Sequence, residues 1–158
     1  MKLKYFIFIV FLCIGYSCDT QYFNTIPDAR VYLTLHLDTD AYDMKLLSQN
    51  SCQIYDKSAK TIRVYTEVER TGYGGILVFH GQVNAVDTYF AYDLACPNEA
   101  NPSVKVAVEN TLFARCPKCK TKYEIWAGVG NPVEGPSKYP LKRYNGLSVN
   151  GSMVTIYN

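Results

Sequence analysis

The chain has 158 residues, of which 48% are apolar and 19% are charged, and its formal net charge is +2. This length suits one domain with its own core, and the composition excludes a disordered tail. The nearly balanced charge gives no sign of a nucleic-acid-binding surface. Tyrosine is over-represented with 14 residues, and frequent Tyr, Thr and Val favour β-strands.

The N-terminus has the pattern of a secretory signal. Two early lysines precede an unbroken apolar run over residues 5–14, which is too short to span a bilayer. Small Ser17 stands directly before Cys18, and polar residues follow. This arrangement resembles a bacterial lipoprotein signal, with a signal peptide over residues 1–17 and lipidation of Cys18. Plain secretion and a retained membrane helix are the alternatives.

Such a leader implies an extracytoplasmic, membrane-anchored lipoprotein on either the periplasmic or the cell-surface face. We expect residues 18–29 to form a lipidated tether and residues 30–158 to form a single domain. Two or three acyl chains would anchor the protein firmly, since each buried methylene contributes roughly 0.8 kcal/mol. Outside the cytoplasm, thiols pair, bind metal or stay buried. The thiols of the expected domain are those of Cys52, Cys96, Cys116 and Cys119.

The remaining chain is dominated by short strand patterns. Alternating apolar and polar residues over 31–37 predict a strand with one buried face, and residues 44–47 predict a short turn of helix. Residues 81–85 and 109–110 predict hairpin connections, as does Asn-Gly at 150–151. About ten short strands predict an all-β antiparallel sandwich or partly closed barrel. The other expected strands are 53–55, 61–68, 76–79, 88–92, 104–108, 111–114, 123–126, 147–149 and 153–157.

The residues suited to chemistry lie in loops between these strands. The first loop, 96–98, reads Cys-Pro-Asn, and the second, 116–119, reads Cys-Pro-Lys-Cys. A third loop contains Gly-Pro at 135–136. Together the three loops resemble those of Rieske domains, which hold a 2Fe–2S cluster on a Cys-x-His loop and a Cys-x-x-His loop. The resemblance runs from about residue 75 to the C-terminus.

The resemblance implies a Rieske-like base domain with a small loop-borne cluster-binding subdomain, whose site loops span about residues 94–141. Cys96 and Cys116 match the two cysteines that hold one iron. Asn98 and Cys119 stand where two histidines hold the other iron. That second iron would receive one thiolate and one weak amide ligand, although iron–sulfur clusters favour thiolate or imidazole.

The resemblance also implies a surrounding shell. Thr121 and Tyr123 stand where the family has hydroxyls that hydrogen-bond to sulfur. Gly135 and Pro136 belong to the loop that covers the cluster. Lys120 departs from the pattern, because glycine is usual at its position.

Three chemical states of the site stay open. Cys96, Cys116 and Cys119, with Asn98 as a weak fourth ligand, could hold an altered 2Fe–2S cluster, or the three thiolates could hold zinc. Alternatively the site holds no metal and its thiols are oxidised. A Cys96–Cys116 disulfide is then favoured, because two cysteines that share a metal need little movement to join. Cys116–Cys119 is the rival pair.

The site loops lie in a basic part of the chain. Residues 115–143 carry seven basic and two acidic side chains, whereas residues 18–114 carry seven basic and twelve acidic ones. Positive neighbours favour thiolates and could attract an acidic protein partner. A solvated loop surface is the alternative. We expect a monomer that binds no nucleic acid.

Three other residues could bear on the site. His36 lies on the polar side of its strand and is expected at the surface. His80 ends the strand over 76–79 and is expected to stay outside the site, with surrogate ligand as its alternative role. Cys52 is expected to be a buried or half-buried free thiol, and otherwise a disulfide partner.

Three functions follow from these observations. The leading hypothesis is a non-enzymatic binding or structural module with thiols in place of the redox centre. The second is an electron-transfer module with an altered cluster. The third is thiol–disulfide exchange at Cys116 and Cys119, although their loop lacks the strand-to-helix setting that such a motif usually needs.

Overall fold

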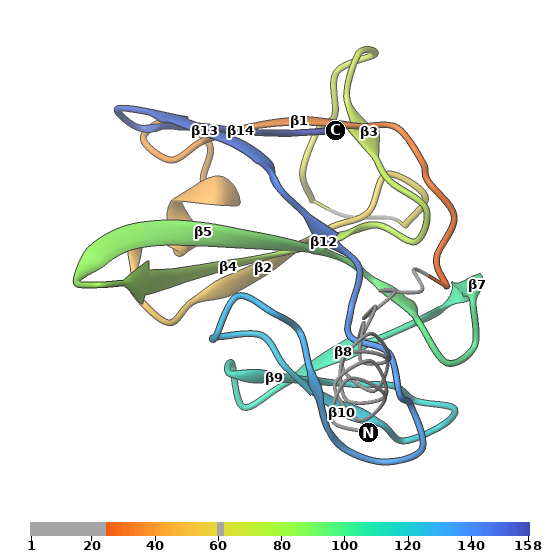
Figure 1. Ribbon diagram of the computed structural model, residues 1–158. Helices are drawn as coiled ribbons and strands as arrows, with labels where there is room; N and C mark the ends of the chain where they lie inside the picture. The colour runs from red at the N-terminus through yellow and green to blue at the C-terminus, as the bar shows by residue number, and fades with distance from the viewer. Residues whose placement is uncertain (1–24, 60–61) are drawn as a thin grey trace, which may run out of the picture.

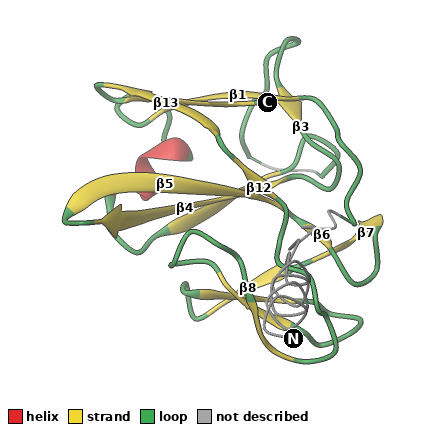
Figure 2. Ribbon diagram, in the orientation of Figure 1, coloured by secondary structure: helices red, strands yellow, loops and turns green. Residues whose placement is uncertain are grey.

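The computed structural model describes residues 25–59 and 62–158, and in this part of the chain nearly all regular structure is β-strand (Figure 1, Figure 2). The described strands form three four-stranded sheets and one two-stranded sheet. The predicted all-β antiparallel class is confirmed, and the sheets stack in layers instead of closing into a barrel. The predicted signal peptide over residues 1–17 and the lipidation site Cys18 lie outside the described residues. Within the described part, no helix is both long and apolar enough to cross a membrane.

The first sheet consists, in order, of β13 (Gly146–Asn150), β14 (Met153–Tyr157), β1 (Val31–His36) and β3 (Arg70–Thr71). The middle sheet consists of β12 (Arg143–Tyr144), β5 (Val86–Asp93), β4 (Ile76–Val83) and β2 (Cys52–Tyr55). The third sheet consists of β11 (Pro132–Glu134), β10 (Lys122–Glu124), β9 (Phe113–Arg115) and β8 (Ala107–Glu109). The two-stranded sheet pairs β6 (Ala95–Cys96) with β7 (Asn101–Lys105). A short 3₁₀ helix, Asp43–Leu47, confirms the predicted helical turn.

The middle sheet is covered on both faces, which explains the apolar run in its central strand. Along β4, Ile76 and Val78 pack into one hydrophobic cluster, whereas Leu77 and Phe79 pack into a second. Successive side chains of a strand point to opposite faces. A strand covered on both sides must therefore be apolar throughout.

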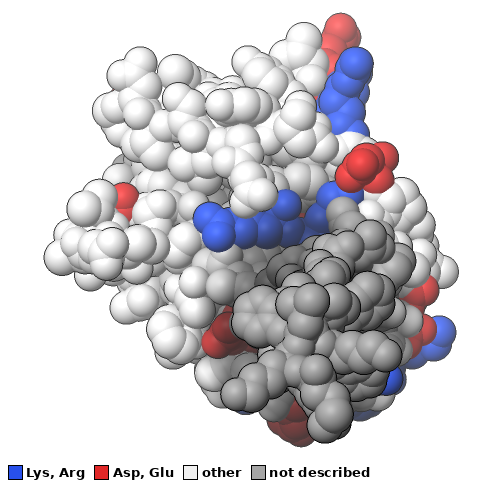
Figure 3. Space-filling model, viewed as in Figure 1, with Lys and Arg blue, Asp and Glu red and all other residues white. Residues whose placement is uncertain are grey.

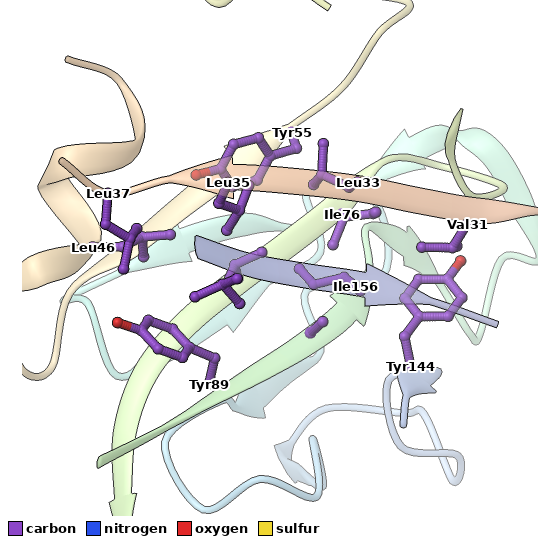
Figure 4. Close-up of a cluster of buried hydrophobic side chains, with 13 residues drawn as sticks. Val31, Leu33, Leu35, Leu37, Leu46, Tyr55, Ile76, Tyr89, Tyr144 and Ile156 are labelled. Carbon is purple, nitrogen blue, oxygen red and sulfur yellow. The ribbon is translucent and has the colours of Figure 1, made fainter. Parts of the chain in front are cut away.

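The first cluster fills the space between the first and middle sheets (Figure 4). From β1, Leu33 and Leu35 point into it, and Ile156 of β14 lies beside them. The second cluster lies between the middle sheet and the third sheet, and it contains Cys96 and Cys116. Two of the thiols therefore belong to a hydrophobic core instead of an open surface.

The strand predicted over 61–68 is wrong. Residues 62–68 form loops and bends, and Thr61 lies outside the described residues. Ile62 and Val64 are 91% and 87% exposed, whereas Arg63 between them is buried. Arg63 Nε lies 3.1 Å from Asp43 Oδ1, and this ion pair turns the polar side chain inward. The alternation of apolar and polar residues over 61–68 therefore belongs to a loop whose charged residue, Arg63, is buried.

Other strand boundaries also differ from expectation. The connection predicted over 81–85 is only the two-residue turn Asn84-Ala85, because β4 and β5 remain paired up to Val83↔Val86. Both turn residues have positive φ, 52° and 63°, as the tight hairpin turn requires. The run 104–108 changes partner at Val106, with β7 pairing to β6 and β8 pairing to β9.

Residues 25–29, the end of the expected tether, lie against the domain. Ile26 is only 1% exposed, and the Thr25 hydroxyl donates a hydrogen bond to the Pro97 carbonyl at 2.8 Å. The Lys142 ammonium donates to the Pro27 carbonyl at 2.8 Å. The described chain thus begins beside one of the cysteine loops.

Candidate metal centre

The first cysteine loop is a four-residue turn between β6 and β7. Cys96 pairs with Asn101 across the loop, and the Ala100 N–H donates to the Cys96 carbonyl at 2.9 Å. Ala100 has a φ of 47°. This left-handed residue reverses the chain so that Cys96, with no exposed surface, faces the second cluster.

The second cysteine loop lies between β9 and β10. The Cys116 N–H donates to the Thr121 carbonyl at 2.9 Å, and the Lys120 N–H donates to the Cys116 carbonyl at 3.1 Å. Lys120 has a φ of 64°, a conformation that glycine adopts more easily. Cys116 is fully buried, whereas Cys119 is half-buried.

The structure brings the three loop cysteines together. The Sγ atoms of Cys96, Cys116 and Cys119 all lie within 4.8 Å of one another. The Cys96 and Cys119 sulfurs are 3.6 Å apart. Among the described residues the cysteines are free, so the predicted Cys96–Cys116 disulfide is not formed here and stays a prediction for oxidised protein.

Two hydroxyl groups reach the sulfurs. The Tyr123 hydroxyl lies 3.4 Å from Cys96 Sγ, and the Thr121 hydroxyl lies 3.2 Å from Cys119 Sγ. Both side chains are fully buried. Both hydroxyls therefore lie at the sulfur group.

The loop that contains Gly135 and Pro136 lies against Thr121. The Ser137 N–H donates to the Thr121 hydroxyl at 3.1 Å. Gly135 has a φ of 99°, and a Cβ at this position would lie 2.6 Å from the Thr121 Cα. Gly135 and Pro136 are themselves exposed, so this loop forms the outer wall of the site.

The thiols of Cys96 and Cys119 differ in acidity. Burial raises the pKa of Cys96 to about 12, although the Tyr123 hydroxyl acts in the opposite direction. For Cys119, burial also opposes ionisation, but the Thr121 hydroxyl and backbone and the neighbouring thiols lower the pKa below its ordinary value. Cys119 is therefore the thiol most easily deprotonated of these two.

The other predicted ligand, Asn98, takes a different place. Its side chain is exposed, and its amide nitrogen donates to Glu99 Oε1 at 3.4 Å. Its backbone N–H is directed at the Cys96 sulfur and favours the thiolate. Sequence reasoning overlooked Glu99, whose carboxylate pairs with the Lys118 ammonium across the two loops. The Cys-Pro pair that begins both loops could have indicated that Glu99 and Cys119, each three residues after a loop cysteine, hold equivalent positions.

The remaining candidates lie apart from the sulfur group. His36 is exposed, as predicted. His80 is buried and stacks on Tyr89 with ring centroids 4.5 Å apart. It is not part of the group that the three sulfurs form. Cys52 is a half-buried free thiol, as predicted, and burial raises its pKa.

Much of the basic charge near the site is paired. Arg115 contacts Glu109 at 2.8 Å and Glu134 at 3.2 Å, and Lys142 contacts Asp28 at 2.6 Å. On the face shown in Figure 3, Lys and Arg side chains form a short band across the middle of the molecule, with acidic side chains nearby. The excess charge is thus partly neutralised within the fold.

These features define an all-β protein with a group of three cysteines, two buried and one half-buried, that could hold a metal. No family model matches the chain, and no curated protein matches it. Among solved structures, the chain is similar to a ferredoxin from Sphingomonas yanoikuyae B1 with a TM-score of 0.42 and 16% identity, over 72% of this chain and 93% of that chain. The chemistry of the site therefore has to be read from its own side chains.

Proposed function

We propose that the protein is a non-enzymatic binding or structural module on a Rieske-like scaffold, and that its three thiols together hold one soft metal ion, with zinc as the first choice. The observation that carries this proposal is the convergence of three sulfurs within 4.8 Å. Soft thiolate ligands select ions such as zinc over hard cations. The ion would link the loop after β6 to the loop after β9 and so stabilise the packing of the two-stranded sheet against the third sheet.

The Rieske-like assignment is supported by the side chains at the sulfur group. Tyr123 and Thr121 direct hydroxyls at the sulfurs, as the resemblance implies. Cys96 and Cys116 come from two separate hairpin loops that meet at one point. These contacts favour a common origin of the two loops with cluster-binding loops, even though both histidines are absent.

The donor geometry fits one ion better than a binuclear cluster. Two sulfurs bound at about 2.3 Å to one tetrahedral ion lie about 3.8 Å apart, and the Cys96 and Cys119 sulfurs are 3.6 Å apart. In a Rieske cluster these two positions serve opposite irons, so the iron–iron distance would separate them further. Three close thiolates fit a single centre.

A thiol–disulfide exchange role receives little support from the site. Exchange requires a thiolate that an incoming disulfide can reach. Cys119 is half-buried with a lowered pKa, but Cys116, the first cysteine of the pair, is fully buried, and a strand instead of a helix follows the pair. A structural role for the thiols needs neither access nor turnover.

In the predicted extracytoplasmic location, a bound ion would protect the thiols. If the N-terminal pattern directs the protein out of the cytoplasm as a membrane-anchored lipoprotein, its thiols meet oxidising conditions. Bound metal would then protect three neighbouring thiols from oxidation. It would also release protons on binding and add its binding energy to the folding energy.

Metal analysis of the full-length chain, purified anaerobically under reducing conditions, tests this proposal. We expect one zinc per chain, no acid-labile sulfide, and a fall in melting temperature when a chelator removes the metal. Cys119→Ser should lose the metal, whereas the matched control Cys52→Ser should keep it. Stoichiometric iron and sulfide with visible colour would instead establish the electron-transfer alternative. A colourless protein without metal under these conditions would contradict the single-ion centre.

A further inference from the structure

The two cysteine loops are built on the same backbone plan. Each begins with Cys-Pro, at 96–97 and at 116–117. In each, the N–H four residues after the cysteine donates to the cysteine carbonyl, at 2.9 Å in the first loop and 3.1 Å in the second. That same residue, Ala100 or Lys120, has positive φ, 47° or 64°. The loops are therefore two copies of one local structure that meet at the sulfur group.

The copies place equivalent side chains at equivalent points. Cys119, three residues after Cys116, carries the third sulfur into the group. The residue three positions after Cys96 is Glu99, whose side chain is only 12% exposed. Glu99 therefore occupies the position in the first loop from which the second loop supplies its second ligand.

We propose that Glu99 is the fourth ligand of the single metal ion held by Cys96, Cys116 and Cys119. This inference rests on the proposed function. Zinc in structural sites is almost always bound by four protein ligands, and a carboxylate oxygen is an accepted one. The four donors would then come in pairs, one pair from each loop.

Lys118 accounts for the orientation of Glu99 in this structure. Its ammonium, on the second loop, pairs with the Glu99 carboxylate, and this pairing is the main cause that raises the pKa of Lys118. Lys118 is 68% exposed, so the ammonium can move into solvent at little cost. Metal binding would exchange one cationic partner of Glu99 for another.

Asn98 fits the ligand position less well than Glu99. The exposed Asn98 side chain donates to Glu99, and its contribution to the loop is the backbone N–H directed at Cys96. A neutral amide oxygen is also a weaker ligand for a soft divalent ion than a carboxylate. Glu99 is not among the residues whose donor atoms lie within 4.8 Å of one another, so its carboxylate has to turn from Lys118 towards the sulfurs to bind. Its negative charge makes it the better fourth donor.

Cobalt(II) titration of the reduced full-length chain, followed by zinc competition, tests the assignment. We expect Glu99→Gln to keep the thiolate-to-cobalt charge-transfer bands of three cysteines, to shift the ligand-field bands, and to lower zinc affinity about ten-fold or more. Glu109→Gln is the matched control, because Glu109 also pairs with a basic side chain, and it should behave as the parent chain. Lys118→Met should raise affinity, because it frees the carboxylate.

Glu99→Cys provides a second, structural measurement. X-ray absorption of the zinc form should change from three sulfur ligands in the parent chain to four in this variant. Circular dichroism establishes that each variant is folded before metal is added.

The outcomes separate the two proposals. Parent-like bands and affinity in Glu99→Gln, or three sulfurs in Glu99→Cys, would overturn the role of Glu99 and leave the three-thiolate centre standing. A loss confined to Asn98→Ala would assign the fourth position to the amide and also overturn it. A parent chain without thiolate-to-cobalt bands would overturn both proposals.

Discussion

The sulfur atoms of Cys96 and Cys119 lie 3.6 Å apart, although 23 residues separate them in the chain. Cys96 ends β6 of the two-stranded sheet, whereas Cys119 lies in the loop that joins β9 and β10, the two central strands of the third sheet. The pairing of β6 with β7 and of β9 with β10 fixes the base of each loop. The distance between the two sulfurs is therefore set by strand packing instead of by local flexibility.

The reactivity of the thiols should follow their exposure and acidity. Cys119 is half-buried with a lowered pKa, whereas Cys96 is buried with a raised pKa. Only thiolates react with iodoacetamide at a useful rate. In reduced protein stripped of metal, Cys119 should be alkylated first, Cys52 more slowly, and Cys96 and Cys116 only after unfolding. Peptide mass spectrometry over time checks this order, and early labelling of Cys96 would contradict it.

The Tyr123 hydroxyl should strengthen metal binding through Cys96. It lies 3.4 Å from the sulfur and favours the thiolate, so Tyr123→Phe should raise the pKa of Cys96 further. Zinc affinity at neutral pH should then fall about ten-fold, and the loss should shrink as pH rises. Chelator competition at several pH values measures this effect. Tyr157→Phe, at a position 45% exposed on β14, is the control and should not change affinity.

Gly135 should be intolerant of a side chain. An added Cβ would lie 2.6 Å from the Thr121 Cα and 2.8 Å from its hydroxyl, at a φ of 99°. Gly135→Ala should lower the free energy of unfolding by about 2 to 3 kcal/mol and weaken metal binding, because Thr121 must move.

Gly151→Ala separates steric clash from backbone preference. Gly151 has a φ of 59°, but no heavy atom lies within 4 Å of its Cβ position. The expected cost is about 1 kcal/mol, without a change in metal affinity. Urea denaturation measures both variants, and equal losses would show that the contact with Thr121 is unimportant.

The Arg63 ion pairs should be the main electrostatic contribution to stability. Arg63 lies 3.1 Å from Asp43 and 3.0 Å from Glu69, and all three side chains are nearly inaccessible. Arg63→Ala would leave two buried carboxylates without their cationic partner and should lower the free energy of unfolding by about 3 to 5 kcal/mol. Thermal denaturation at pH 7 measures the loss, and a change below about 1 kcal/mol would contradict it.

The same site predicts a pH dependence. Burial alone would raise the pKa of Glu69, but the Thr66 backbone N–H and Arg63 lower it below its ordinary value of 4.5. Glu69 therefore stabilises the fold above pH 4.5, and this stabilisation declines as pH falls through its lowered pKa. The difference in stability between the parent chain and Glu69→Gln should be largest near pH 7 and smaller near pH 3. The exposed Glu67→Gln should show little difference at either pH.

Strand predictions succeeded where at least one face of the strand packs against apolar side chains. The run 76–79 is apolar because both faces of β4 are covered, and 31–37 alternates because only one face is. The prediction failed at 61–68, because alternation cannot show that Arg63 turns inward to meet Asp43 and Glu69. The short edge strands β11 and β12 were missed, since two or three residues carry no periodic signal.

By itself, the sequence determined the all-β class, the two Cys-Pro loops and the residues near them, because local periodicity and turn chemistry act over a few residues. Only the tertiary structure decided that three sulfurs share one point, that Asn98 is exposed, and that the Glu99 carboxylate pairs with Lys118 across the two loops. These outcomes depend on packing between strands that are distant in the chain, and the free energy of such contacts cannot be inferred from any short segment.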